Sequence, residues 1–534
     1  MKKLWLISAI LTIVISATIS CNRQKEAATA KPGVTGTSWL EEMTISELQQ
    51  GYTSGKYKVA DVVSAYLARI EEIDNKGPAL NSIITLNPDA MSIAEKLDSM
   101  NAGEKALLPL FGIPVVIKDN IDTHDRMPNT AGATVLRNSF PASDSPVARK
   151  LREAGAVIIA KSNLSEWANF RGMTSSSGWS GIGGQTKNPY VLDRNPCGSS
   201  SGSGVSVSAN LCMIAIGTET NGSIVCPSNN NGIVGLKPTV GLISRTGIIP
   251  ISFTQDTPGP MGRTVEDVAA CLGALTGIDT ADSKTLQSTG HSYTDYRQFL
   301  RKDGLRGKRI GFLKSSGGFS DRVDTLMKNA VIFMKEQGAE IIEVEEPRGS
   351  GYDDASFQVL LFEFKDGLNK YFSGLGEDAP VKNLTELIEF NKKDTVELRF
   401  FDQKILEMAD KKGDLSSPEY REALKKMLSA TRQNGIDKIM DSGSLDALIA
   451  PTGSPAWKTD HILGDHFVGG SSSLAAISGY PAITVPMGFI DELPVGITFF
   501  GKAWSEPLLL EIANGYEQGT KHRRAPKYLT TDSF

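Results

Sequence analysis

The sequence predicts an α/β protein built around a large, mostly buried sheet. Short apolar runs typical of strands alternate with stretches whose apolar residues recur every three or four positions, as on one helix face. The strands are apolar throughout, which indicates a sheet covered by helices on both faces. The chain has 534 residues, 40% of them hydrophobic, and a net charge of −5. Because both signs of charge are interspersed, nucleic acid is not expected as a partner.

The first 21 residues have the pattern of an export signal. Two lysines precede an apolar run from Leu4 to Ile15, which is too short for a comfortable membrane span. The pattern ends at Cys21, as in bacterial lipoprotein signals, although Thr18 stands where such signals usually carry Leu. We expect an exported protein of the periplasm or cell envelope that contacts the membrane only through lipid on Cys21. An ordinary cleaved signal is the alternative, and residues 22–38 are expected to be a flexible linker.

The N-terminal half of the folded domain is expected to alternate helices and strands. Thr44 and Glu47 have the spacing of a capping box, which marks the start of a helix. The elements predicted next are a helix at 59–73, a strand at 82–86, a helix at 88–100, a strand at 113–117, a helix at 145–155 and a strand at 156–160. Lys118 directly follows an apolar strand, so its ammonium group either reaches water or is held partly desolvated.

The alternation continues in the C-terminal half. Strands are predicted at 211–216, 310–313, 340–344, 445–450, 482–485 and 496–500, and a helix at 322–337. The segment 350–440 is more polar and predicts a helical insertion with solvated faces. No second hydrophobic centre is evident. We therefore expect one large domain, residues 39–525, followed by a tail at 526–534.

The stretch 195–232 carries the candidate chemistry. A Ser/Gly run and the pair Gly222–Ser223 flank the strand predicted at 211–216, so two serine-bearing turns could meet at one site. The chain has only five histidines. A lysine can replace histidine as the base where burial lowers its pKa, and a serine can then relay the proton.

A second interpretation of the same run is the nucleophile elbow of an esterase, with Ser200 as nucleophile. That elbow requires an apolar strand just before it, whereas residues 186–197 are typical of a loop. Three histidines could complete the site, but the sequence around them gives no sign of a catalytic role: His461, His466 and His522. Neither histidines nor cysteines have metal-ligand spacing, so we expect no metal.

Four cysteines lie beyond the export signal: Cys197, Cys212, Cys226 and Cys271. An exported protein can pair such residues. Cys212, however, lies in an apolar run and should behave as a small buried hydrophobe. We expect all four to be free thiols.

Three ordered blocks resemble the signature of the amidase signature family: Gly112–Asp119, Cys197–Ser203 and Gly217–Ile224. Gly235–Thr239 and Gln255–Pro260 follow as they do in that family. The segments that look most like its peptide amidase branch are Ser165–Phe170, Gly183–Pro189 and Pro494–Gly501. Several motifs in order are far more specific than any one alone.

The resemblance implies the amidase-signature fold, with a mixed, mostly parallel sheet. It implies that Lys118 is the base, that Ser199 bridges after a cis peptide bond at Gly198, and that Ser223 is the nucleophile. The backbone N–H groups that match the oxyanion hole belong to Thr220, Asn221, Gly222 and Ser223. The resemblance requires no metal or organic cofactor.

Some positions depart from the family or are harder to assign. Glu219 and Asn221 stand where many members have Asp and Gly, and Val205 replaces a usual alanine. The positions that resemble supporting site residues, but could equally be structural, are Ser177, Arg245 and Asp256. Ser200, Ser201 and Ser203 are expected to be loop hydroxyls.

These observations predict an amidase that hydrolyses carboxamide C–N bonds with water, through an acyl-enzyme. Peptide C-terminal amides or amino-acid amides are the expected substrates. Small aliphatic or aromatic amides are an alternative, as is the glutaminase subunit of a tRNA-dependent amidotransferase, although the export signal argues against a cytosolic complex. A silent binding protein on the same scaffold is disfavoured by the intact set of Lys118, Ser199 and Ser223.

Overall fold

The computed structural model describes residues 37–346, 351–377 and 379–531. The predicted export signal, Cys21 and most of the linker at 22–38 therefore lie outside the described residues. Contacts group these described residues into one compact unit. No helix in the described part of the chain is long and apolar enough to cross a membrane.

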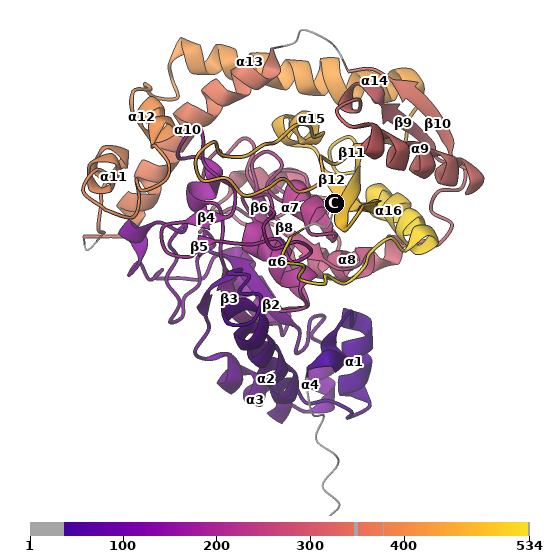
Figure 1. The fold of residues 1–534 in the computed structure, drawn as a ribbon, viewed down its shortest axis with the longest axis horizontal. Coiled ribbons are helices and arrows are strands. Elements are labelled where there is room, and N and C mark those ends of the chain that lie inside the picture. The colour runs from indigo at the N-terminus through magenta and orange to yellow at the C-terminus, as the bar shows by residue number, and fades with distance from the viewer. Residues whose placement is uncertain (1–36, 347–350, 378, 532–534) are drawn as a thin grey trace, which may run out of the picture. The chain divides into compact units, whose positions relative to one another are not determined.

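A single large sheet, eleven strands wide within the described residues, forms the centre of this unit (Figure 1). Its strands are β1 (Ile83–Leu86), β2 (Pro114–Lys118), β3 (Val157–Ser162), β6 (Ile214–Glu219), β7 (Val234–Lys237), β8 (Thr257–Gly262), β9 (Arg309–Leu313), β10 (Glu340–Val344), β11 (Ala447–Pro451), β12 (Ala482–Ile490) and β13 (Leu493–Phe500). Their order across the sheet is β1-β3-β2-β6-β8-β7-β12-β13-β11-β9-β10. Two short strands, β4 (Trp179–Ser180) and β5 (Gly184–Gln185), pair separately.

The sheet is mixed, as predicted, but the expected excess of parallel pairs is wrong. The pairs β2–β3, β2–β6, β9–β10 and β9–β11 are parallel, and the others are antiparallel. Only Asp491 and Glu492 separate β12 from β13, and so short a connection permits only antiparallel pairing. In addition, β8 lies between β6 and β7 and is antiparallel to both.

Helices cover both faces of the sheet, as the surroundings of two glycines in β8 show. A Cβ added at Gly259 would meet Ile224, just before α7, whereas one added at Gly262 would meet Val268 in α8. Because alternate strand residues point to opposite faces, α7 and α8 lie on opposite sides. The helices outside the 350–440 segment are α1 (Ile45–Thr53), α2 (Val59–Arg69), α3 (Ala90–Ser99), α4 (Ala102–Ala106), α5 (Pro146–Glu153), α6 (Ser201–Ser208), α7 (Val225–Asn230), α8 (Val265–Leu275), α9 (Asp321–Glu336), α15 (Ser472–Ser478) and α16 (Glu506–Thr520).

The segment 350–440 is helical, as predicted, and appears in orange tones in Figure 1. It contains α10 (Tyr352–Gly374), α11 (Leu384–Asn391), α12 (Lys404–Asp410), α13 (Pro418–Thr431) and α14 (Asp437–Gly443). The expectation that no second hydrophobic centre exists is wrong. One apolar cluster joins α10, α11 and α12 to Trp167 and Phe170, and another joins α10, α13 and α14 to β11 and α15. The long helix α10 contributes to both clusters.

Most predicted element positions are confirmed. The capping box forms at α1, where the Thr44 hydroxyl accepts from the Glu47 amide at 3.2 Å. The strand predicted at 211–216 instead runs from Ile214 to Glu219. The predicted tail is paired with the domain over part of its length, because Leu529 forms a parallel bridge with Val191.

Candidate active site

Lys118 lies at the carboxyl end of β2 and is completely buried. Its Nζ lies 2.7 Å from Ser199 Oγ, 3.1 Å from Ser200 Oγ and 2.9 Å from Thr218 Oγ1. Thr218 belongs to β6, which pairs in parallel with β2. Burial lowers the pKa of Lys118 from its usual 10.5 to about 7, against the charges of Asp256 and Glu219, which raise it. A lysine so placed can exist as a neutral amine near neutral pH.

Ser199 and Ser200 precede α6 and are also buried. The peptide bond between Gly198 and Ser199 is cis, as the resemblance implies. Ser200 Oγ donates to the Thr218 carbonyl at 3.0 Å and accepts from the Thr218 amide at 3.2 Å. Because it is enclosed in this way, Ser200 has no open side for a substrate, and the esterase elbow is disfavoured.

Ser223 lies in the turn between β6 and α7, next to the Ser199–Ser200 segment. The Ser200 amide donates to the Ser223 carbonyl at 3.2 Å. Ser223 is 8% exposed, and its hydroxyl has no hydrogen-bond partner among the described residues. The two serine-bearing turns therefore meet, as the sequence predicts, although no hydrogen bond joins the hydroxyls of Ser199 and Ser223.

The turn that carries Ser223 leaves several backbone donors free. Within the described part of the chain, the N–H groups of Asn221, Gly222 and Ser223 donate to no protein acceptor. Gly222 has φ of 83°, a conformation that favours glycine. Unpartnered backbone donors are what an oxyanion hole requires, and these lie beside the free hydroxyl of Ser223.

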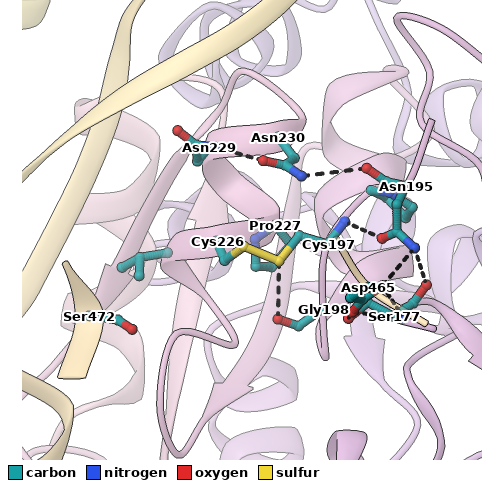
Figure 2. The surroundings of a disulfide bond; sticks show 12 residues. Ser177, Asn195, Cys197, Gly198, Cys226, Pro227, Asn229, Asn230, Asp465 and Ser472 are labelled. Carbon is teal, nitrogen blue, oxygen red and sulfur yellow. Dashed lines mark hydrogen bonds between the residues drawn. A yellow bond between two sulfur atoms is a disulfide. The ribbon is translucent and has the colours of Figure 1, made fainter. Parts of the chain in front are cut away.

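The expectation of free thiols is wrong for two cysteines, because Cys197 and Cys226 form a disulfide (Figure 2). Their Cα atoms lie 5.9 Å apart, since the contact between Ser200 and Ser223 brings the two turns together. Cys197 comes two residues before Ser199, and Cys226 comes three residues after Ser223. The disulfide therefore ties together the segments that carry both serines. Cys212 and Cys271 are free and buried, as predicted.

Two of the three supporting residues pair with carboxylates and do not hydrogen-bond to Lys118, Ser199 or Ser223. Ser177 donates through its hydroxyl to Asp465 at 2.5 Å, as Figure 2 shows beside Gly198. Arg245 forms an ion pair with Asp282 at 2.6 Å. Asp256 lies closer to the site and accepts from the Thr220 hydroxyl at 2.6 Å.

Three polar residues that complete these contacts are not predicted by the sequence. Thr218 ends an apolar run and gave no polar signal. The Asn120 amide donates to Thr218 Oγ1 at 3.1 Å, and Asp465 holds Ser177 from a loop far along the chain. The Lys-Asp-Asn sequence at the end of β2 could have suggested Asn120, whereas nothing in the sequence links Asp465 to Ser177.

A cavity of about 370 Å³ opens beside the site. Asn120, Thr218, Thr220 and Asp256 line its polar part, and isoleucines at 248, 249 and 251 contribute to its apolar part. Lys118, Ser199 and Ser223 do not line this cavity, which adjoins the site through Thr218 and Thr220.

No histidine in the described part of the chain hydrogen-bonds to a serine of the site. His461 Nε2 instead lies 2.8 Å from Gln185 Oε1. Nor do residues 37–346, 351–377 and 379–531 contain a group of three or more His, Cys, Asp or Glu side chains that could hold a metal ion.

Comparison with known proteins bears on this arrangement. The amidase family model matches residues 61–510. A probable amidase of Arabidopsis thaliana is 38% identical over 499 residues, which cover 92% of each chain. A glutamyl-tRNA(Gln) amidotransferase subunit of Microcystis aeruginosa is 33% identical, and the match covers 91% of this chain and 99% of that one.

Among solved structures, the peptide amidase PAM in complex with the competitive inhibitor chymostatin superimposes with a TM-score of 0.88 and 47% identity. The match covers 91% of this chain and 99% of that one. This chain and that peptide amidase are thus similar in fold, sequence and length across nearly the whole described domain. The chain belongs to the amidase (amidase signature) family and is an amide-hydrolysing enzyme.

Proposed function

We propose that this enzyme cleaves carboxamides with Ser223 as nucleophile, Ser199 as proton relay and Lys118 as base. The observation that carries the proposal is the environment of Lys118. Its buried amine contacts hydroxyl and carbonyl oxygens, and among the described residues no carboxylate lies within ion-pair distance of it. A lysine without an adjacent counter-charge can lose its proton, and the neutral amine can then accept a proton from Ser199.

In the first step Ser223 Oγ attacks the amide carbonyl carbon and its proton passes to Ser199 Oγ. Ser199 at the same time gives its own proton to Lys118 Nζ. The negative charge that develops on the carbonyl oxygen is stabilised by the backbone N–H groups of Thr220 to Ser223.

In the second step the C–N bond breaks and the leaving nitrogen takes a proton from Ser199. Lys118 returns its proton to Ser199, so the amine departs neutral and Ser223 is left acylated. Water then attacks the ester carbonyl, and the same relay takes the proton of the water and returns one to Ser223 Oγ.

Peptide C-terminal amides or amino-acid amides are the proposed substrates. Similarity to a peptide amidase at 47% identity over the whole domain supports this choice. The relationship to a glutamyl-tRNA(Gln) amidotransferase, at 33% identity, keeps glutamine as the second substrate to be tested. On the basis of the first 21 residues alone, we also propose that the protein is exported and carries lipid on Cys21.

The test is ammonia release from C-terminally amidated peptides, amino-acid amides, simple aliphatic and aryl amides, and glutamine. We expect Ser223→Ala and Lys118→Ala to lose at least about a thousandfold in kcat/KM, because each acts as part of one unit. Ser201→Ala is the matched control, since its hydroxyl donates to the Cys197 carbonyl and makes no contact with Lys118.

Turnover that survives in Ser223→Ala, or disappears in Ser201→Ala to the same extent, contradicts the assignment. Turnover of glutamine or simple amides in preference to peptide amides contradicts the substrate proposal but leaves the mechanism standing. Binding of substrate to Ser223→Ala without turnover is expected of an enzyme whose nucleophile is missing.

A further inference from the structure

We propose that Glu219 is a positioning residue that holds the turn carrying Ser223 in its reactive shape. This inference rests on the proposed function of Ser223. Glu219 is the last residue of β6 and is 1% exposed. It touches neither the proposed nucleophile nor the proposed base through a hydrogen bond, so any effect on catalysis must pass through the backbone or through its charge.

The contacts of Glu219 close the turn on itself. Its Oε2 accepts hydrogen bonds from the backbone N–H groups of Ile224 at 2.7 Å and Val225 at 3.1 Å. These residues follow Ser223 directly, so one carboxylate oxygen bridges the residue before the turn and the residues after it. Hydrogen bonds from amides to a carboxylate are among the stronger ones in proteins.

The rest of the turn is held by its side chains, and its central amides stay free. The Thr220 hydroxyl donates to Asp256 at 2.6 Å, and Asn221 accepts from Ser472 at 2.7 Å. These contacts fix the first half of the turn. Within the described residues, Glu219 supplies the side-chain contacts on the other side of Ser223, while the N–H groups proposed for the oxyanion hole have no acceptor.

The charge of Glu219 acts on two buried lysines. Glu219 and Glu506 both raise the pKa of Lys237, which burial lowers to about 8. Glu219 also raises the pKa of Lys118 together with Asp256, the other charged group that acts on it. Removal of this charge should therefore lower the pKa of Lys118 and shift the acid limb of kcat/KM to lower pH.

Glu506 provides a matched control in the same chain. It is completely buried, accepts a hydrogen bond from the backbone N–H of Thr239 at 2.6 Å and acts on the same Lys237. It differs in the segment that it holds, because Thr239 follows β7 and is not part of the turn of Ser223. Both glutamates can be changed to Gln, which keeps a side-chain carbonyl oxygen as acceptor but removes the charge. Both can also be changed to Ala, which removes the acceptor and the charge.

The experiment compares Glu219→Gln, Glu219→Ala, Glu506→Gln and Glu506→Ala in the full chain. We measure kcat and KM on a peptide amide, the pH profile, and hydrogen exchange of the backbone amides at 219–226. Glu219→Ala should lose about a hundredfold in kcat with little change in KM, as expected when oxyanion donors are displaced. Glu219→Gln should lose less and should show the acid shift. In both Glu219 variants the amides of Ile224 and Val225 should exchange faster than in the Glu506 pair.

The proposal is overturned if folded Glu219→Ala keeps wild-type kcat, if the Glu506 variants lose as much kcat, or if exchange at 224 and 225 does not change. If Glu219→Ala does not fold, Glu219→Gln decides by its kcat and by the exchange of the amides at 224 and 225. If the wild-type protein hydrolyses no amide, the proposed function fails. The exchange rates at 224 and 225 still decide whether Glu219 holds the turn.

Discussion

Lys118 can act as a base only when its amine is neutral, and its surroundings set the pH at which this happens. Burial lowers its pKa to about 7, whereas the charges of Asp256 and Glu219 raise it. The amine loses its proton as the pH rises through 7. We therefore expect kcat/KM to rise about tenfold per pH unit below pH 7 and to level off above it. Initial rates of ammonia release between about pH 5 and about pH 9 measure this limb.

Lys118→Arg is the matched variant for the pH profile. A guanidinium stays protonated over the whole range, so this variant should remain nearly inactive at every pH. An acid limb close to the ordinary lysine pKa, or wild-type activity in Lys118→Arg, is incompatible with a neutral Lys118 as base.

At the scale of single residues, the sequence predicted the meeting of Lys118 and Ser199 but not their surroundings. That meeting was implied by the resemblance of the three ordered motifs to the amidase signature family. Thr218 was not predicted as a site residue, because a threonine at the end of an apolar strand is common in sheets. The contacts of Ser177 with Asp465 and of Arg245 with Asp282 depend on loops that fold back from distant positions, which local patterns do not encode.

At the scale of elements, apolar periodicity located strands but missed where β6 ends. The sequence predicts a strand at 211–216, whereas β6 extends through Thr218 to Glu219. These last residues are polar and yet buried, because they contact Lys118, Ile224 and Val225. A rule that equates buried strands with apolar residues fails where the strand end serves the site.

The disulfide between the turn before α6 and the first turn of α7 gives a prediction at this scale. Its half-cystines are 29 residues apart in sequence, and cross-linking a loop of that length stabilises a fold by about 3–4 kcal/mol in the chain-entropy model. Because the loop contains Ser199 and Ser223, Cys197→Ser/Cys226→Ser should lower both the urea midpoint and kcat. Unfolding curves and initial rates of the double variant measure the two effects.

A reducing agent provides the control for the disulfide. Treatment with a phosphine should slow the wild type toward the double variant and leave the double variant unchanged, because the double variant lacks the Cys197–Cys226 bond that the phosphine reduces. Intact mass determines whether the bond was reduced. A fully reduced wild type with unchanged kcat and midpoint would show that the disulfide does not support the site.

At the scale of the whole molecule, the sequence predicted the class of fold but not its assembly. The larger share of antiparallel pairs, which was not predicted, comes from pairings such as β6–β8 and β7–β12, which join segments far apart in sequence. Likewise, the segment that contains α10 was predicted to have solvated helix faces, yet many residues of α10 are buried. They join two separate clusters because different partners pack along the helix. Long-range packing therefore decides what local patterns leave open.

The contact between the helical insertion and the loop beside Gly198 gives the last prediction. Arg171 is 2% exposed and binds Glu166 at 2.6 Å and Glu397 at 3.1 Å, so it joins residues 165–181 to the segment between α11 and α12. Arg171→Met leaves Glu166 and Glu397 buried without their cation, which should destabilise the protein by about 3–5 kcal/mol. Arg149→Met, which breaks the exposed pair with Glu153, should cost less than about 1 kcal/mol. Urea unfolding followed by tryptophan fluorescence compares them, and equal midpoints for the two variants would refute a buried ionic link between loop and insertion.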